Sequence, residues 1–331
     1  MWFPVAGSDQ VKAGDVYGAQ IGDQELVLFR NGDGDICVLE DRCPHRRVPL
    51  SLGKVIDGHL RCAYHGWTFD GKDGQCVAIP NLDESENIPK SLCATAFRAV
   101  ESGGFIYVST VGEGGAEDFP CRPPEGWHYE KTASGCAVVS VPPQEYLAAM
   151  LDGPHTLIGI RGINISDFYI GDVARENNCL TVDRTAIWTL KTKPHEKLWG
   201  LSTLVLRTEI WPEQSVVRVQ LLDAGEEILL AAVIAVVPGK RHTSQLHWRC
   251  YYSSNFAHAA PLAVRLRVGK GCPLDVFSAV EGAALADLMV GPSAELALPV
   301  LTDSASPTYS DVISSDRRSP RTGENTAEES V

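Results

Sequence analysis

The chain has 331 residues, of which 44% are hydrophobic and 21% are charged. This length allows about two domains of ~150 residues each, and the composition is that of a soluble globular protein with a substantial core. The formal net charge of −13 argues against nucleic acid as a partner, because phosphate binding needs a basic face.

The sequence predicts neither a secretory leader nor a membrane span. Its first residues, MWFPVAGSDQ, lack the charged start, apolar centre and cleavage site of a signal peptide. The longest apolar run, Ile228 to Val237, is too short to cross a bilayer. The ten cysteines are scattered without a compact disulfide framework. We therefore expect a cytoplasmic protein with reduced thiols, some of which bind metal, and no membrane partner.

Residues 1–110 read as short β-strands separated by turns. Asn31 to Gly34, the run NGDG, is typical of a hairpin turn between two β-rich runs. Gly103 to Thr110, GGFIYVST, predicts a closing strand. Residues 111–135 are rich in Gly, Pro and acidic residues and form the expected linker.

Residues 136–301 show a second pattern, with a helix expected over Gln144 to Leu151 and another over Asp275 to Met289. We expect this part to be an α+β domain built on an antiparallel sheet. Residues 302–331, dominated by Ser, Thr, Pro and charge, are expected to be a disordered tail. The expected strands cover Thr185 to Leu190, Leu201 to Trp211, Ser215 to Leu222, Ile228 to Val237 and Ser244 to Tyr252.

The strongest motif is CPHRRVPLSLGKVIDGHLRCAYHGW, which spaces four metal-ligand residues as C-x-H and, sixteen residues later, C-x2-H. Two thiolates and two imidazoles can hold a single zinc, or a [2Fe-2S] cluster with Cys on one iron and His on the other. Zinc fingers usually pair like with like, whereas each loop here carries one Cys and one His. This spacing favours the cluster, and its four ligands would be Cys43, His45, Cys62 and His65.

The run CPHR followed by CxxHGW resembles the Rieske domain, and the runs WFPVA at Trp2 and GFIYV at Gly104 resemble its flanks in Rieske non-heme iron oxygenases. The chain is similar to the short homotrimeric type that includes vanillate demethylase. The resemblance implies an all-β Rieske domain followed by a helix-grip-like antiparallel sheet catalytic domain. Arg47 stands where that family often has Gly.

The resemblance also implies a mononuclear Fe(II) site held by two His and one carboxylate in the second domain. Its pattern, D-x2-H-x4-H, begins in register with Asp152 and His155, but the position of the second histidine is Ile160. By resemblance, Asp152 would carry electrons from a cluster histidine of one subunit to His155 of the next.

Three alternatives follow from Ile160. Another histidine completes the site, the site binds iron with fewer ligands, or the site is degenerate. The candidates for the first alternative are His195, His242, His247 and His258. For the carboxylate, the resemblance points to Asp275, with Glu281 and Asp287 as rivals, although Asp275 could equally cap the helix expected to follow it.

The expected function is that of a Rieske-type oxidoreductase, a terminal oxygenase component that oxidises or demethylates a small organic substrate with O2. The implied donor is an external NAD(P)H-dependent reductase or ferredoxin, and the implied assembly is a homotrimer. The alternative is an electron-transfer or partner subunit in a hetero-oligomer with a complete homologue, carrying a cluster but no working mononuclear iron.

Overall fold

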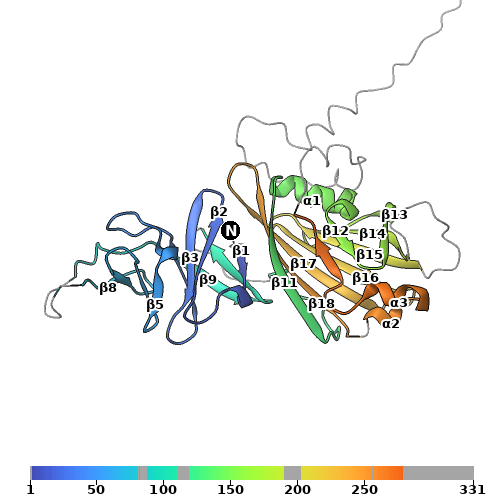
Figure 1. Cartoon of the computed structure of the whole chain (residues 1–331). Coiled ribbons are helices and arrows are strands. Elements are labelled where there is room, and N and C mark those ends of the chain that lie inside the picture. Colours follow the sequence, from blue (N-terminus) through green and yellow to red (C-terminus); the bar gives the residue numbers. More distant parts are fainter. Residues whose placement is uncertain are drawn as a thin grey trace, which may run out of the picture.

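The structure is a computed structural model of the chain, and it describes residues 2–80, 82, 88–110, 119–189, 203–254 and 256–278. Figure 1 shows two β-rich parts lying side by side, the first at the left and the second at the right. The expected tail, residues 302–331, and part of the expected linker, residues 111–118, lie outside the described residues.

The first part is built on a six-stranded antiparallel sheet in the order β1-β10-β9-β4-β3-β2. The expected hairpin is confirmed, since β3 and β4 pair on either side of the NGDG turn. Asn31 Oδ1 accepts hydrogen bonds from the amides of Asp33 and Asp35, which closes the turn. The strands are β1 (Trp2–Gly7), β2 (Val16–Ile21), β3 (Gln24–Arg30), β4 (Ile36–Glu40), β9 (Ala96–Ser102) and β10 (Phe105–Ser109).

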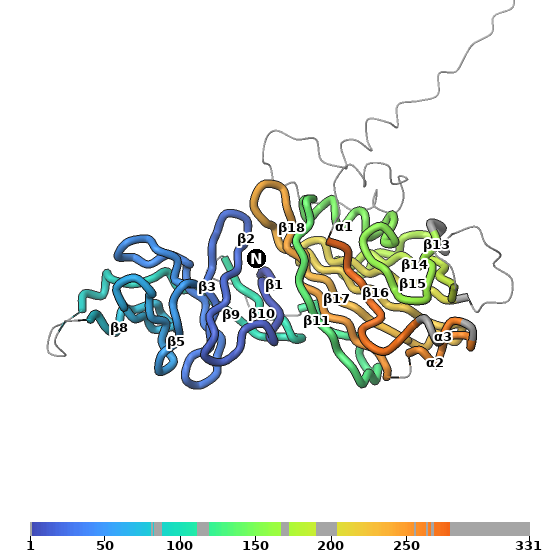
Figure 2. Tube along the Cα trace, in the orientation of Figure 1, coloured from blue at the N-terminus to red at the C-terminus, as the bar shows by residue number. Residues whose placement is uncertain are grey.

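A small four-stranded sheet is inserted between β4 and β9 and carries the Cys/His motif. Its strands are β5 (Lys54–Ile56), β6 (His59–Arg61), β7 (Thr68–Phe69) and β8 (Cys76–Ala78), paired in that order. In Figures 1 and 2 this sheet lies at the end of the molecule farthest from the second part.

The second part is a seven-stranded antiparallel sheet in the order β11-β18-β17-β16-β15-β14-β13. It begins at Lys131, ahead of the expected boundary at Cys136. Its strands are β11 (Lys131–Val139), β13 (Ile163–Glu176), β14 (Cys179–Trp188), β15 (Thr203–Trp211), β16 (Val216–Leu222), β17 (Ile228–Pro238) and β18 (Ser244–Tyr252).

One face of this sheet is covered by helix α1 (Pro143–Asp152), which packs on β15, β16 and β17. The α+β class with an antiparallel second domain is therefore confirmed. The short helices α2 (Phe256–Ala259) and α3 (Leu262–Val268) had no counterpart in the sequence-based expectation.

The expected helix beginning at Asp275 is wrong at its start. Residues Leu274–Val276 form strand β19, which pairs antiparallel with β12 (Ile158–Ile160). Leu274 lies opposite Ile160 and Val276 lies opposite Ile158, so apolar side chains on both strands favour extended pairing over a helical turn. Asp275 is therefore not a helix N-cap.

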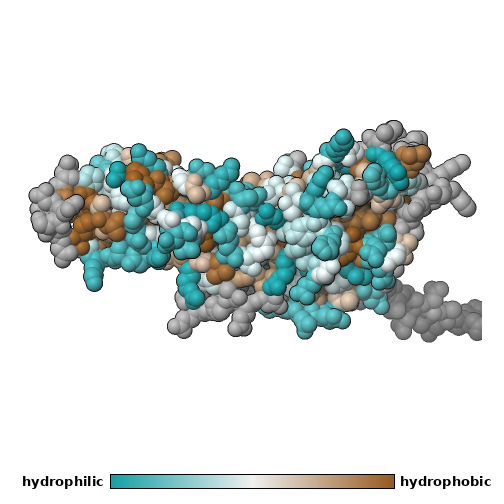
Figure 3. All heavy atoms as spheres, turned by 90° about the horizontal axis from the view of Figure 1, so that it is seen from below, coloured by the Kyte–Doolittle hydropathy of each residue, from teal (hydrophilic) through white to brown (hydrophobic). Residues whose placement is uncertain are grey.

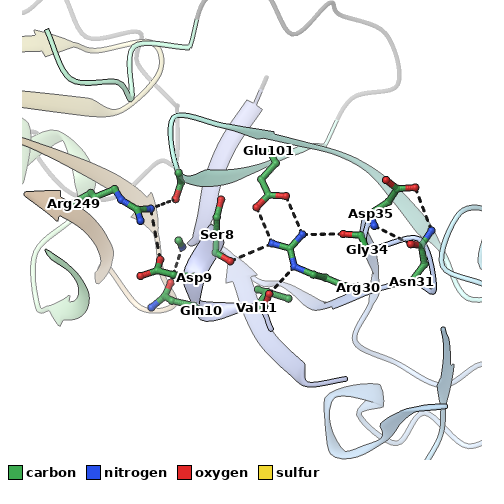
Figure 4. A network of polar contacts seen from close by, with 12 residues as sticks. Ser8, Asp9, Gln10, Val11, Arg30, Asn31, Gly34, Asp35, Glu101 and Arg249 are labelled. Atoms are coloured by element: carbon green, nitrogen blue, oxygen red, sulfur yellow. Dashed lines mark hydrogen bonds and ion pairs between the residues drawn. The ribbon is translucent and has the colours of Figure 1, made fainter. Parts of the chain in front are cut away.

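The two parts meet along β1, β17 and β18. Val237 of β17 packs into an apolar cluster made otherwise of first-domain residues. Figure 4 shows the polar edge of this contact, where Arg249 of β18 donates to the carbonyl of Gly104 at 2.8 Å and lies 3.7 Å from Asp9 Oδ1. Beside it, Arg30 binds both carboxylate oxygens of Glu101. Hydrophobic and charged contacts thus join the two sheets.

No helix within the described ranges is long and apolar enough to cross a membrane.

Candidate functional site

The Cys/His motif folds into two loops that repeat the same backbone hydrogen bonds. In the first loop the amide of Cys43 donates to Val48 O at 2.9 Å, and the amide of Arg47 donates to Cys43 O at 2.8 Å. In the second, Cys62 N donates to Trp67 O at 2.8 Å and Gly66 N donates to Cys62 O at 3.1 Å. The two loops therefore present their Cys and His side chains in matched positions.

The loops bring the four motif residues together, with the thiols inside and the imidazoles outside. Cys43 and Cys62 are 2% and 3% exposed, whereas His45 and His65 are exposed at the surface. The imidazole centroids of His45 and His65 lie 4.7 Å apart. Trp67 stacks on His45 with ring centroids 4.5 Å apart and an interplanar angle of 5°, which fixes the orientation of that imidazole.

The pKa values of one thiol and one imidazole of this group are shifted. Burial, with a contribution from the adjacent Cys62, raises the pKa of the Cys43 thiol. Partial desolvation and the neighbouring His65 lower the pKa of His45, which favours the neutral imidazole that binds metal. Because a metal ion binds the thiolate, metal binding at Cys43 would release the proton that its raised pKa retains.

This arrangement fits a [2Fe-2S] cluster. An inner iron would take the two buried thiolates and an outer iron the two exposed imidazoles, which is the division that a Rieske centre needs. The donor set is also compatible with zinc by element type. The pairing of Cys with Cys inside and His with His at the surface favours two metal ions at different depths.

Exposed apolar side chains lie on the cluster loops and next to them. Tyr64 is 62% exposed and its ring centroid lies 3.8 Å from that of His65, and Leu52, at the end of the 3-10 segment Leu50–Leu52 that follows the first loop, is 66% exposed. Figure 3 shows brown, hydrophobic areas at this end of the molecule. An exposed apolar rim around a redox centre is suited to transient docking of another protein.

In the second domain, Asp152 and His155 lie at the end of α1, as the resemblance implied. Asp152 is the last residue of the helix and is 9% exposed. The chain then turns through a 3-10 segment, Pro154–Thr156, in which His155 is half-buried. The Thr156 hydroxyl donates to Gly153 O at 2.8 Å and tightens the turn.

Arg184 is a residue of this region that the sequence analysis missed. It is 1% exposed, and its Nη2 donates to the carbonyls of Leu151 and Asp152, each at 2.5 Å. The guanidinium thus satisfies the carbonyl end of α1, where a cation is favoured by the helix dipole. The signal was available, since the alternation of β14 puts Arg184 on the same face as the buried Val182 and Ala186.

Ile160 and Asp275 do not form a metal site together with His155. The Ile160 side chain is 4% exposed and belongs to the main core cluster. Asp275 lies opposite Gly159, on the other face of the β12–β19 pair, and is exposed. Within the described ranges, no three His, Cys, Asp or Glu side chains converge as a single metal ion would require.

Four other histidines were candidates for the second iron ligand, and they lie as follows. His258 is exposed on α2 and His242 lies in the turn after β17. His247 is buried on β18, but on the face opposite to that of Leu246 and Cys250, which belong to the core shared with α1. His195, Glu281 and Asp287 lie outside the described residues.

Comparison with known proteins agrees with the first domain's geometry. Residues 1–92 match the model of the Rieske [2Fe-2S] domain. The chain is 41% identical over 107 residues to the chloroplastic protein TIC 55 of Arabidopsis thaliana, covering 32% of this chain and 20% of that protein. It is 34% identical over 179 residues to the chloroplastic chlorophyllide a oxygenase of Chlamydomonas reinhardtii, covering 50% and 26%. The chain thus spans only about a fifth to a quarter of these relatives' own length.

The two-domain arrangement also has a counterpart among solved structures. The structure of dicamba monooxygenase bound to dicamba superposes with a TM-score of 0.55 at 22% identity, covering 77% of each chain. The first domain of the chain is therefore a Rieske [2Fe-2S] domain. Its relatives and structural neighbours include Rieske non-heme iron oxygenases, whose fold it shares.

Proposed function

We propose that this protein is the terminal oxygenase component of a Rieske-type system, which oxidises a small organic substrate by monooxygenation or oxidative demethylation. The observation that carries the proposal is the pair of matched loops that holds two buried thiols and two exposed imidazoles on one side of an oxygenase fold. When bound, the cluster supplies one-electron transfer at a potential raised by its imidazole ligands.

In this proposal Cys43, His45, Cys62 and His65 hold the cluster, and the apolar rim at Tyr64 and Leu52 receives the electron donor. That donor is an external NAD(P)H-dependent reductase or a ferredoxin. The small sheet that carries the cluster loops lies at the far end of the molecule from α1 (Figure 1). This separation supports electron transfer to Asp152 and His155 from the cluster of another copy, in a homotrimer or a mixed oligomer.

Asp152 would act as the bridge, and its near burial at the end of α1 and its closeness in sequence to His155 support that role. His155 would be an Fe(II) ligand. The described residues supply no complete triad, so the remaining ligands would have to come from residues outside them, where Glu281 and Asp287 lie.

The second candidate is an electron-transfer or partner subunit that carries the cluster without a working mononuclear iron. The burial of Ile160 in the core and the exposure of Asp275 favour it. Such a subunit would pass electrons to a complete homologue in a hetero-oligomer.

Iron content separates the two candidates. The purified protein is reconstituted with iron and sulfide, and the iron per chain is measured together with the low-temperature EPR spectrum of the reduced sample. About three irons per chain, with an Fe(II) signal that responds to nitric oxide, support the oxygenase. About two irons and a Rieske signal alone support the partner subunit, and a colourless protein with zinc contradicts both.

A companion variant tests the missing ligand directly. We expect Ile160→His to raise the iron content toward about three per chain if His155 is a ligand, because an imidazole would then stand at the family's second position. The matched control is Ile158→His, which changes the neighbouring buried position of the same strand. Equal iron content in all three proteins would count against a mononuclear site at His155.

The cysteines support a cytoplasmic location. All ten cysteines are free, and eight of them are buried or half-buried, which suits the reducing cytoplasm. No partner of nucleic-acid or membrane type is part of the proposal, given the net charge of −13.

A further inference from the structure

Two cysteines outside the cluster loops lie together where the β12–β19 pair meets the large sheet. Cys250 is a core residue of β18 and is fully buried. Cys272 is half-buried, packs against the same core, and lies two residues before the start of β19. The side chains of Cys250 and Cys272 lie in the same core region, close enough to interact, although 22 positions separate them in the sequence.

The segment around Cys272 is held in place from the other side by Arg161. The Arg161 guanidinium donates to the carbonyl of Cys272, and the Arg161 amide donates to Pro273 O at 2.9 Å. These bonds connect the segment to the residue that follows β12. The nearby guanidinium also places a positive charge beside the Cys272 sulfur.

The pKa values of the two thiols are shifted in opposite directions. The hydrogen bond from Cys250, with the charge of Arg161, lowers the pKa of Cys272 to about 7. The same contact, with burial, raises the pKa of Cys250. At neutral pH Cys272 is thus partly thiolate and reachable from solvent, while its neighbour stays protonated. By contrast, burial raises the pKa of Cys76 and brings that of Cys121 to about 12, so those thiols are inert.

We propose that Cys250 and Cys272 form a reversible disulfide when the protein meets hydrogen peroxide. The Cys272 thiolate attacks one peroxide oxygen, the O–O bond breaks, and the departing hydroxide takes up a proton as water. Cys272 is then a sulfenic acid. The Cys250 sulfur attacks the Cys272 sulfur, the S–O bond breaks, and the second hydroxide leaves as water with the Cys250 proton. Two thiols lose two electrons and the peroxide is reduced to two waters.

The disulfide would join β18 covalently to the segment that enters β19. Through β19 it would fix β12, which pairs with it residue by residue, and Leu157, whose carbonyl accepts from the Phe277 amide at 2.9 Å. Leu157 follows the turn that carries His155. Oxidation would therefore restrain the wall of the second domain beside the end of α1. The proposal needs neither a mononuclear iron nor an oxygenase activity.

Peptide mapping tests this directly. The reduced protein, with its cluster, is treated with a few equivalents of peroxide, blocked with iodoacetamide and digested with trypsin without reductant. Cleavage after Arg249, Arg265 and Lys270 puts the two cysteines on separate peptides, and cleavage after Arg42 and Arg61 separates both from Cys43 and Cys62. We expect a peptide pair that joins Cys250 to Cys272, lighter than its parts by two hydrogens (~2 Da) and separated by dithiothreitol.

Three cysteine variants test which thiol reacts with peroxide and which thiol then closes the disulfide. In Cys250→Ser the sulfenic acid on Cys272 should accumulate and be trapped by dimedone, whereas Cys272→Ser should give neither product. Cys93→Ser, which removes an exposed cysteine, should leave the cross-link unchanged. The proposal is overturned if peroxide carries Cys272 to sulfinic acid in the unmutated chain, or leaves it a thiol, without a link to Cys250.

Discussion

Arg47 and Gly66 occupy the same place in the two cluster loops, four residues after Cys43 and Cys62. Each donates its amide to the carbonyl of that cysteine. Both have a positive φ, 59° at Arg47 and 72° at Gly66. Glycine adopts this region freely, whereas a residue with a Cβ is strained there. Arg47 stands where the family often has Gly. The substitution therefore strains the backbone at one residue and removes no metal ligand.

Replacing Arg47 with glycine should stabilise the first domain. Because the Arg47 side chain is exposed, Arg47→Gly removes the left-handed strain and loses little packing. We expect a gain of about 1 kcal/mol in the free energy of unfolding. Urea unfolding followed through the visible absorbance of the cluster measures it. A decrease in stability would mean that the arginine makes a contribution larger than its strain.

Gly66→Ala is the matched control for the second loop. A Cβ there would combine the same φ with a contact of 2.8 Å to Pro80 Cγ. We expect a loss of about 1–2 kcal/mol in the same measurement. If both variants moved stability in the same direction, the equivalence of the two loops would not hold.

At the scale of elements, α1 ends inside the protein with its last carbonyls directed at Arg184. Leu151 and Asp152 lie in the core cluster or at its edge, where water cannot reach their backbone oxygens. An acidic residue at a helix C-terminus is also disfavoured by the dipole. A buried guanidinium offsets both effects, which explains an arginine on the core face of β14.

Replacing Arg184 with methionine should therefore destabilise the second domain. The carbonyls of Leu151 and Asp152 would be left buried without the guanidinium, and we expect Arg184→Met to cost about 3 kcal/mol of unfolding free energy. Circular dichroism during urea unfolding measures the loss. The control is Arg207→Met, since Arg207 pairs with Asp183 on the partly exposed face of the same sheet, with side chains 38% and 27% exposed. That change should cost at most about 1 kcal/mol.

Local sequence patterns predicted those strands and turns that depend on residues close together in the sequence. The NGDG turn predicted the β3–β4 hairpin, and the apolar run Ile228 to Val237 predicted the strand that β17 forms. The β12–β19 pair could not be found in this way. Each strand has three residues, and its partner lies more than a hundred residues away. The candidate iron site is limited in the same way. The Cys and His residues of the cluster loops lie close together in the sequence, whereas His155 and Asp275 lie more than a hundred residues apart.

At the scale of the whole molecule, the face of the large sheet opposite α1 packs on the first domain. Tyr251 of β18 lies on that face, clusters with Phe105 and Tyr107, and donates to Gly103 O at 3.2 Å. His247 is on the same face and is 3% exposed. Within the described residues, neither of its ring nitrogens has a hydrogen-bond partner. This face of the sheet thus carries a buried imidazole that has neither a hydrogen-bond nor an ion-pair partner among the described residues.

This imidazole makes the stability of the protein depend on pH. Burial lowers the pKa of His247 from 6.5 to about 4. The unfolded chain therefore takes up a proton as the pH falls below about 6.5, and the folded protein does so only near pH 4. Stability is complete above the unfolded value, declines as the pH falls between the two, and is level below pH 4. Between pH 7 and pH 5 the loss from this residue should be about 2 kcal/mol.

The variant His247→Leu should remove that part of the pH dependence, because the substituted side chain does not titrate. We would measure urea unfolding at several pH values from 7 to 5 for the unmutated chain, for His247→Leu and for His258→Leu. His258 is exposed on α2, so its replacement should leave the slope unchanged. The quantity compared is the change of unfolding free energy with pH in each protein, which cancels any difference in absolute stability between them. Equal slopes in all three proteins would show that the interface admits water or a charge to His247, and that the contact between the two sheets is looser than the apolar packing of β1, β17 and β18 implies.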